Sequence, residues 1–140
     1  MDSAVILPPD YKPSKDEEYM NEMQLEYFKR KLLDWRAELM KGSEMTLQDL
    51  KAGTPNEADA NDRASTETDQ FMELRTRDRM RKLIKKINQA LDRIENGTYG
   101  YCEETGEPIG IARLEARPAT TLCIEAQERH ERKEKTFAEE

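Results

Sequence analysis

The sequence predicts a mainly α-helical fold: a long antiparallel coiled-coil hairpin with a small globular base and a C-terminal helix. Two stretches of the chain carry apolar residues at alternating spacings of three and four, and a break with glycine and proline separates them. A short segment rich in turn residues follows the second stretch. Charged residues make up 38% of the 140 residues and aromatic residues only 6%, which is typical of long solvated helices rather than of a large core.

The first arm of the predicted hairpin lies in the N-terminal part of the chain. Ser14 and Glu17 fit a capping box, which predicts a helix that begins near Lys15. An a/d heptad stripe follows at Leu25, Phe28, Leu32, Trp35 and Leu39. The letters AGTP at 52–55 predict the end of this helix, because glycine and proline both interrupt helical structure.

The second arm begins after this break. Thr54 fits a helix N-cap because proline and glutamate follow it at suitable spacing. The alternative is a helix that starts a few residues later, at Asp59 or Asp62. Its heptad stripe consists of Met80, Ile84, Ile87, Leu91 and Ile94. Gly97 predicts the end of the helix. Antiparallel pairing brings the two stripes together and leaves a polar tip near residues 53–64.

Charge is segregated along the second arm. Residues 57–73 carry six acidic side chains and one basic one, whereas residues 75–86 carry seven basic side chains and one acidic one. Interspersed acidic and basic side chains would stabilise a simple spacer helix better, through i,i+4 ion pairs. The segregated charges therefore favour a rod that docks with a charged partner. The alternative, which the heptads alone support equally well, is a structural coiled-coil dimerisation protein.

Two cysteines follow the hairpin at positions typical of a zinc knuckle. A Cys-x-x-Cys pair that starts at Cys102 would end at Thr105, and one that starts at Cys123 would end at Ala126. A structural zinc site needs four nitrogen or sulfur ligands, and His130 lies about 10 Å further along a helix than Cys123. We therefore expect a degenerate, zinc-finger-like site that holds no metal, and a protein that requires no cofactor.

Apolar side chains would then hold this base together in place of a metal ion. The predicted core residues are Tyr99, Tyr101, Ile109, Ile111, Leu114 and Leu122. A disulfide between Cys102 and Cys123 stays open in principle. However, two cysteines without an export signal indicate a reducing compartment, and we expect a cytoplasmic protein.

Composition and motifs also exclude several classes of function. The net charge of −7 argues against a general nucleic-acid-binding protein, which would need a basic face. The longest apolar run, AVIL, is too short for a membrane span. Cys102 or Cys123 with His130 could be imagined as nucleophile and base, but no orienting group or oxyanion donor is evident, so we expect no enzyme.

These observations divide the chain into four parts. Residues 1–20 would pack on the base, and residues 21–97 would form the coiled-coil hairpin. Residues 98–122 would form the degenerate zinc-finger-like module, and residues 123–140 the C-terminal helix.

Several motifs resemble the DksA/TraR zinc-finger family of RNA polymerase regulators. They include DANDRA at the predicted tip, ELRTRDRMRKLIKKI in the second arm, and GTYGYCEETGEPIGIARLEARPATTLC in the base. The likeness extends from about Glu17 to Glu134, and the motifs occur in the family's order and spacing. Family members carry cysteine at Thr105 and Ala126, so the chain resembles a variant that lacks two of the four zinc cysteines.

The resemblance implies a monomer that binds bacterial RNA polymerase at the secondary channel, without binding DNA or a membrane. With the alarmone ppGpp, such proteins modulate initiation at ribosomal RNA and amino-acid biosynthesis promoters, as part of the stringent response. The coiled-coil tip, with Asp59, Asp62 and Ala64, would reach toward the polymerase active site. Arg79 on the shaft would contact the rim of the channel.

The resemblance also implies a ppGpp pocket that is shared with the polymerase. Leu83, Lys86 and Arg117 would line it, and cationic groups are what a polyphosphate requires. A further lysine of the family is replaced here by Gln127, which removes one expected phosphate contact.

Overall fold

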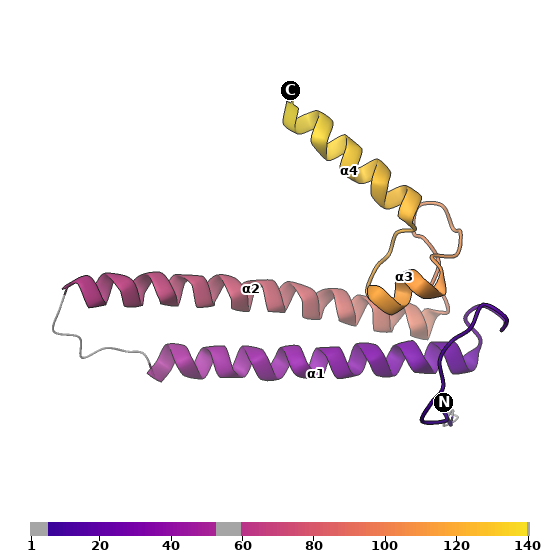
Figure 1. Cartoon of the computed structure of the whole chain (residues 1–140), viewed down its shortest axis with the longest axis horizontal. Helices are drawn as coiled ribbons and strands as arrows, with labels where there is room; N and C mark the ends of the chain where they lie inside the picture. Colours follow the sequence, from indigo (N-terminus) through magenta and orange to yellow (C-terminus); the bar gives the residue numbers. More distant parts are fainter. Residues whose placement is uncertain (1–5, 53–59, 140) are drawn as a thin grey trace. The chain divides into compact units, whose positions relative to one another are not determined.

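The structure is a computed structural model that describes residues 6–52 and 60–139, with side chains described outside 43–52, 60–66 and 137–139. The described residues form four helices: α1 (Glu22–Ala52), α2 (Ala60–Asn96), α3 (Ile111–Ala116) and α4 (Ile124–Glu139) (Figure 1). Within these described ranges there is no β-strand, only an isolated antiparallel bridge between Tyr101 and Pro108. The predicted mainly α-helical class is confirmed.

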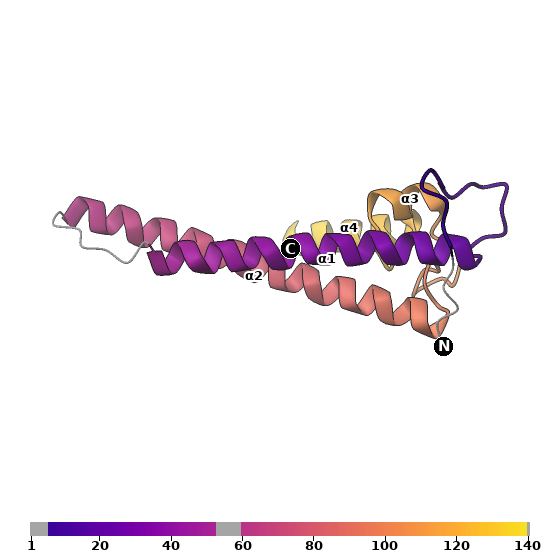
Figure 2. The ribbon, with the colours of Figure 1, turned by 90° about the horizontal axis from the view of Figure 1, so that it is seen from below.

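The chain divides into two compact units, and both long helices contribute to each of them. The hairpin unit is Asp34–Ile87, and the base unit combines Met1–Leu33 with Asn88–Glu140. In the hairpin unit, α1 and α2 run side by side in opposite directions (Figures 1 and 2). Gly42 of α1 lies against Met80 of α2, since a Cβ on this glycine would stand 3.4 Å from the Met80 Cε atom. This contact agrees with the antiparallel pairing that the heptads predict.

The core of the base unit brings together parts of the chain that are far apart in sequence. The ring centroids of Phe28 on α1 and Tyr99 after α2 lie 5.8 Å apart. The buried apolar side chains of this unit are Phe28, Leu32, Ala90, Tyr99, Cys102, Ile109, Leu114, Cys123 and Ala126. Because both cysteines belong to this core, they pack as small apolar groups as well as standing at the zinc-finger positions.

Three of the predicted core residues are less buried than expected. Tyr101 is 38% exposed, although its ring makes a T-shaped contact with the Tyr19 ring, with centroids 5.6 Å apart. Ile111 and Leu122 are half-buried. The prediction of Tyr101 as a core residue was therefore wrong.

The start of α1 is also later than predicted. The backbone N–H of Ser14 donates to the Glu17 carboxylate at 2.9 Å, as in a capping box, but these residues form a turn. The helix begins at Glu22, and the side chain of Asn21 accepts the backbone N–H of Gln24 at 2.8 Å. Asn21 therefore provides the cap that the sequence analysis assigned to Ser14.

The end of α2 agrees with the prediction. Gly97 has a φ of 78°, in the left-handed region that favours glycine. The backbone N–H of Thr98 then bonds to the carbonyl of Arg93 at 2.9 Å and satisfies one of the last carbonyls of the helix. No described helix is long and apolar enough to cross a membrane.

Candidate functional site

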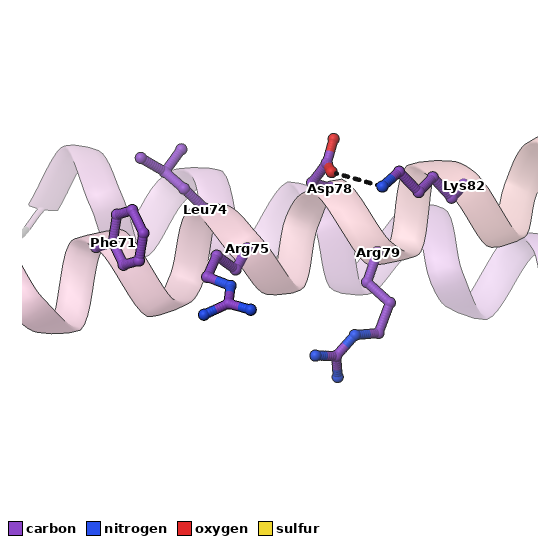
Figure 3. A pocket seen from close by; sticks show the side chains of 6 residues that line it. All are labelled: Phe71, Leu74, Arg75, Asp78, Arg79 and Lys82. Carbon is purple, nitrogen blue, oxygen red and sulfur yellow. Dashed lines mark ion pairs between the residues drawn. The ribbon is translucent and has the colours of Figure 1, made fainter. Parts of the chain in front are cut away.

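An open groove of about 370 Å³ lies along α2 in the hairpin unit. Its lining combines two apolar side chains with four charged ones: Phe71, Leu74, Arg75, Asp78, Arg79 and Lys82 (Figure 3). These residues recur at spacings of three and four, so they share one face of the helix. The face differs from the heptad stripe that packs toward α1, because continuing that stripe backwards from Met80 skips both apolar residues.

The two apolar side chains of the groove are unusually open to solvent. Phe71 is 61% exposed and Leu74 is 50% exposed. A single exposed apolar residue needs no explanation, but two on one helix face beside a groove indicate a contact surface. The sequence analysis missed both, although their position off the heptad stripe was a usable signal.

The charges of the groove leave a positive surplus. Asp78 pairs with Arg81 at 2.8 Å and with Lys82 at 3.4 Å, and hydrogen bonds from these two side chains hold the pKa of its carboxyl below the usual value. Arg75 stands over the Phe71 ring, 5.9 Å from its centroid. Among described side chains, Arg79 has no ion pair, and Figure 3 shows its guanidinium on the same side of α2 as that of Arg75. The groove can thus bind an acidic partner that also presents apolar side chains.

The other residues predicted to contact the polymerase or ppGpp are divided between the two units. Leu83 is half-buried and Lys86 is exposed on α2 of the hairpin unit, whereas Arg117 follows α3 in the base unit and is exposed. A shared ppGpp pocket stays a prediction. Asp59 lies outside the described residues, and the side chains of Asp62 and Ala64, both on α2, are not described.

The cysteine knuckle lies in the base unit and is closed by backbone hydrogen bonds. The N–H of Cys102 donates to the carbonyl of Glu107 at 2.8 Å, and the N–H of Gly106 donates to the carbonyl of Cys102 at 2.8 Å. Cys123 directly precedes α4, and its carbonyl accepts the N–H of Gln127 at 3.0 Å. These bonds fix both cysteines, which are only 3% and 7% exposed.

Thr105 lies next to both sulfur atoms. Its hydroxyl oxygen is 3.9 Å from the sulfur of Cys123. Burial raises the pKa of the Cys102 thiol, but hydrogen bonds from the Thr105 hydroxyl and from the backbone N–H groups of Cys123, Thr105 and Glu104 outweigh it and lower the pKa to about 6. These hydrogen bonds favour the thiolate form of Cys102.

The side chains at the four zinc-finger positions do not fit a structural zinc ion. They supply two thiols, the hydroxyl of Thr105 and the methyl group of Ala126, which is fully buried. Structural zinc requires four nitrogen or sulfur ligands, and a methyl group can supply none. The described part of the chain contains no group of three or more histidine, cysteine, aspartate or glutamate side chains that could hold a metal ion.

His130 does not complete the ligand set. Its Nε2 atom contacts the carboxylate of Glu104, and Arg129 lies 3.9 Å from the same carboxylate. A hydrogen bond from His130 is the main cause that lowers the pKa of the Glu104 carboxyl. The histidine therefore ties α4 to the knuckle loop through Glu104.

A tyrosine fastens the N-terminal segment to the knuckle. The hydroxyl of Tyr19 donates to the carbonyl of Gly100 at 2.7 Å and accepts the N–H of Gly110 at 2.9 Å. Gly100 has a φ of 92°, and a Cβ atom there would lie 2.8 Å from the side chain of Met20. Both ends of the knuckle loop are thus held by one hydroxyl group.

Comparison with known proteins shows which family has this architecture. Residues 24–94 match the family model described as the DnaK suppressor protein DksA, N-terminal domain, and residues 97–132 match the prokaryotic dksA/traR C4-type zinc finger. The RNA polymerase-binding transcription factor DksA of Caulobacter vibrioides is 59% identical over 142 residues, which cover 100% of both chains. The protein of the same name from Escherichia coli (strain K12) is 45% identical over 91% of this chain and 85% of its own.

The solved structures agree with the sequence comparison. The structure of transcription factor DksA2 from Pseudomonas aeruginosa has a TM-score of 0.78 and 44% identity, and the match covers 84% of this chain and 90% of that one. These relatives are named as transcription factors, and their family is one of regulators rather than enzymes. With 59% identity over the full length, the chain belongs to the DksA/TraR family.

Proposed function

We propose that this chain is a cytoplasmic transcription regulator that binds bacterial RNA polymerase at the secondary channel, as a monomer and without contacting DNA. The observation that carries the proposal is the groove on α2, where exposed Phe71 and Leu74 lie beside the cationic Arg75 and Arg79. Such a surface suits a large protein partner with acidic and apolar groups. It agrees with the names of the relatives, which are RNA polymerase-binding transcription factors.

The groove and the tip have different tasks in this proposal. The groove supplies affinity through contacts at the rim of the channel, with Arg79 among them. The tip residues Asp59, Asp62 and Ala64 change the behaviour of the polymerase near its catalytic magnesium region. Two carboxylates can make new polar contacts there, and a small alanine permits close approach.

A nucleotide effector completes the mechanism. Lys86 and Arg117 bind phosphates of ppGpp, and Leu83 packs against the ligand, in a pocket formed together with the polymerase. The result is weakened initiation at ribosomal RNA promoters and activation at amino-acid biosynthesis promoters. The chain does this without zinc, because the hydrogen bonds and apolar core of the base hold the knuckle in shape.

The central test is transcription in vitro from a ribosomal promoter, with and without ppGpp. The variant Asp59→Asn with Asp62→Asn should bind polymerase nearly as the parent does but lose inhibition, since asparagine keeps the shape and helix-start chemistry of aspartate. Asp69→Asn, a change on the same helix beyond the tip, is the matched control. Full inhibition by the double variant would contradict the role of the tip.

The groove has a separate test in polymerase binding. Arg79→Ala should weaken binding by about tenfold or more, because a charge-assisted hydrogen bond contributes roughly 1.5–3 kcal/mol. Lys85→Ala removes an exposed cation from the same helix outside the groove and should have little effect. Equal losses for both variants would mean that only overall charge matters. A sedimenting dimer of the parent would favour a structural coiled-coil protein instead.

The effector site is tested by titration with ppGpp. Lys86→Ala and Arg117→Ala should each raise the midpoint about tenfold, and leave the weaker ppGpp-independent effect in place. Gln127→Lys should lower the midpoint, because it adds a cation. Unchanged curves for both alanine variants would remove this pocket from the proposal.

The independence from zinc is tested by metal analysis of the purified chain together with a thermal melt. We expect less than stoichiometric zinc and a melting curve that a strong chelator does not move. A sharp fall in melting temperature on chelation would show that zinc holds the base.

A further inference from the structure

The groove on α2 has a chemistry that suits two kinds of partner. An exposed aromatic ring beside cationic side chains can bind an acidic protein surface. The same combination binds single-stranded nucleic acid, whose bases stack on the ring while its phosphates contact the cations. Phe71 is 61% exposed, and Arg75 stands over its ring. Nucleic acid would therefore compete with a protein partner unless the groove distinguishes the two.

The cations of the groove belong to a longer row on the same face of α2. Four exposed side chains at spacings of i, i+4, i+7 and i+11 form this row: Arg75, Arg79, Lys82 and Lys86. The row is about 16 Å long at 1.5 Å rise per residue, so it can follow several phosphates of one strand. Asp78 is the one acidic residue of the stretch 75–86, and it lies in the groove.

The carboxylate of Asp78 changes the charge of this row. It pairs with Arg81 at 2.8 Å and with Lys82 at 3.4 Å. Figure 3 shows the pair with Lys82 on the edge of the groove opposite to the guanidinium of Arg79. Both ion pairs are open to solvent and contribute little to stability, so stability alone does not explain an acidic residue here. The carboxylate engages one cation of the row and adds a negative charge beside the others.

We propose that Asp78 is a specificity-determining residue that keeps single-stranded nucleic acid out of the groove. A folded protein can place a cation or a hydrogen-bond donor opposite this carboxylate. A nucleic acid strand carries a negative charge at every nucleotide and cannot avoid the repulsion. Specificity of this kind depends on the repulsive group as much as on the attractive ones. The exclusion of nucleic acid goes beyond the proposed binding of polymerase.

The test is a titration of a fluorescently labelled uridine oligoribonucleotide with the full-length chain, at low salt and without polymerase. Fluorescence anisotropy should show that Asp78→Asn binds this RNA about tenfold or more tightly than the parent does, because the change removes a repulsive charge and frees Lys82 for a phosphate. The matched control is Asp69→Asn, which makes the same change of net charge at an exposed position of α2 outside the groove. It should bind as the parent does, and so should Asp78→Glu, which keeps the negative charge.

A second substitution locates the bound RNA. Phe71→Ala and Arg79→Ala, each combined with Asp78→Asn, should remove most of the gained affinity, because one removes a stacking surface and the other a phosphate contact. Lys85→Ala in the same background removes an exposed cation of α2 outside the groove and should have a smaller effect. Equal losses for all three would place the RNA outside the groove and overturn the proposal.

The comparison of the single variants has two further outcomes that would overturn the proposal. RNA binding by the parent as tight as by Asp78→Asn would mean that the carboxylate excludes nothing. An equal gain for Asp69→Asn would mean that only the net charge matters. Asp78→Ser is a second neutral variant in case asparagine disturbs the helix. If a neutral variant keeps the helix content of the parent by circular dichroism and gains no RNA binding, the proposal is wrong.

This titration can fail separately from the proposed function. No polymerase is present, so a negative result with RNA leaves the binding of polymerase by the groove untouched. Conversely, Arg79→Ala that binds polymerase as the parent does would contradict the proposed function and would leave the role of Asp78 to be decided by the RNA titration.

Discussion

The core of the base unit and the groove of the hairpin unit place their apolar side chains in opposite ways. In the base unit, Leu114 is fully buried, and the hydroxyl of Tyr99 donates to the carbonyl of Pro118 at 2.8 Å. In the hairpin unit, Phe71 is 61% exposed and Leu74 is 50% exposed, and both line an open groove. The base therefore uses these apolar residues for its own stability, whereas this part of the hairpin leaves them open to solvent.

The charged groups follow the same division. In the base unit, the carboxylate of Glu115 accepts a hydrogen bond from Tyr27 at 2.7 Å and pairs with Lys31 at 2.9 Å, so one residue of α3 is tied to α1 twice. On the groove, the described charges pair only along α2, as Asp78 does with Lys82. Substitutions in the base should thus reduce stability, and substitutions in the groove should reduce binding.

The largest contrast is expected between two leucine truncations. Leu114→Ala should lower the free energy of unfolding by about 2–5 kcal/mol, because it leaves a cavity in the core of the base. Leu74→Ala should change stability by less than about 0.5 kcal/mol, because its side chain is half exposed, and should instead weaken polymerase binding. Urea unfolding measures the first effect for both variants. Equal losses of stability in the two variants would contradict the difference between the core of the base and the groove.

Two glycines of the base unit allow a finer test of how packing determines stability there. Gly97 and Gly100 both have positive φ, but a Cβ at Gly97 meets nothing within 4 Å, whereas one at Gly100 meets Met20 at 2.8 Å. Gly97→Ala should cost about 1–2 kcal/mol for the backbone conformation alone. Gly100→Ala should cost more, because Met20 must also move. The difference between the two thermal melts isolates the contact with the N-terminal segment, and equal shifts would show that this contact is unimportant.

The Glu115 pair should produce the smallest effect, and one that depends on pH. Burial raises the pKa of the Glu115 carboxyl, but hydrogen bonds from Tyr27 and Lys31 outweigh it and hold the pKa below its usual value of 4.5. The pair therefore stabilises the fold above about pH 4.5, and this contribution is lost as the pH falls through the lowered pKa. Glu115→Gln should cost about 1 kcal/mol at pH 7 and much less near pH 3.

The control for this prediction is Glu95→Gln, a change at an exposed position of α2. Its stability should follow that of the parent from pH 7 to pH 3. A loss for Glu115→Gln that stays constant over this range would mean that the substitution disturbs packing rather than removing an ionised pair.

The hairpin was predictable because its signal is periodic. Residues such as Leu32 and Ile87 lie on stripes that an antiparallel helix pair can bury, and both are fully buried. The N-terminal cap was not predictable in the same way, because Ser14 and Asn21 both have suitable chemistry. Only tertiary contacts, such as the bond from Tyr19 to Gly100, decide where the turn ends and the helix begins.

The candidate sites were predictable to different degrees. Spacing alone identified Thr105 and Ala126 as the positions where two zinc-finger cysteines are missing, because a Cys-x-x-Cys knuckle is a local motif; the structure adds the contact between Thr105 and Cys123. The groove was missed because the sequence analysis followed the heptad stripe and did not ask why Phe71 and Leu74 lie off it; the structure shows them beside Arg79. The roles of the tip and of the ppGpp residues depend on a second molecule, so no property of this chain alone could establish them.

The base unit is assembled from both ends of the described chain, and this has a consequence for synthesis on the ribosome. Tyr19 bonds to Gly100 and Gly110, partners 81 and 91 residues away. The N-terminal segment therefore emerges long before the loop that it fastens, whereas the hairpin can form as soon as its own residues are made. Once formed, the hairpin shortens the effective loop that must close, which lowers the entropic cost of these long-range contacts. The coiled coil would then help the base to fold, because it brings the two segments of the base together.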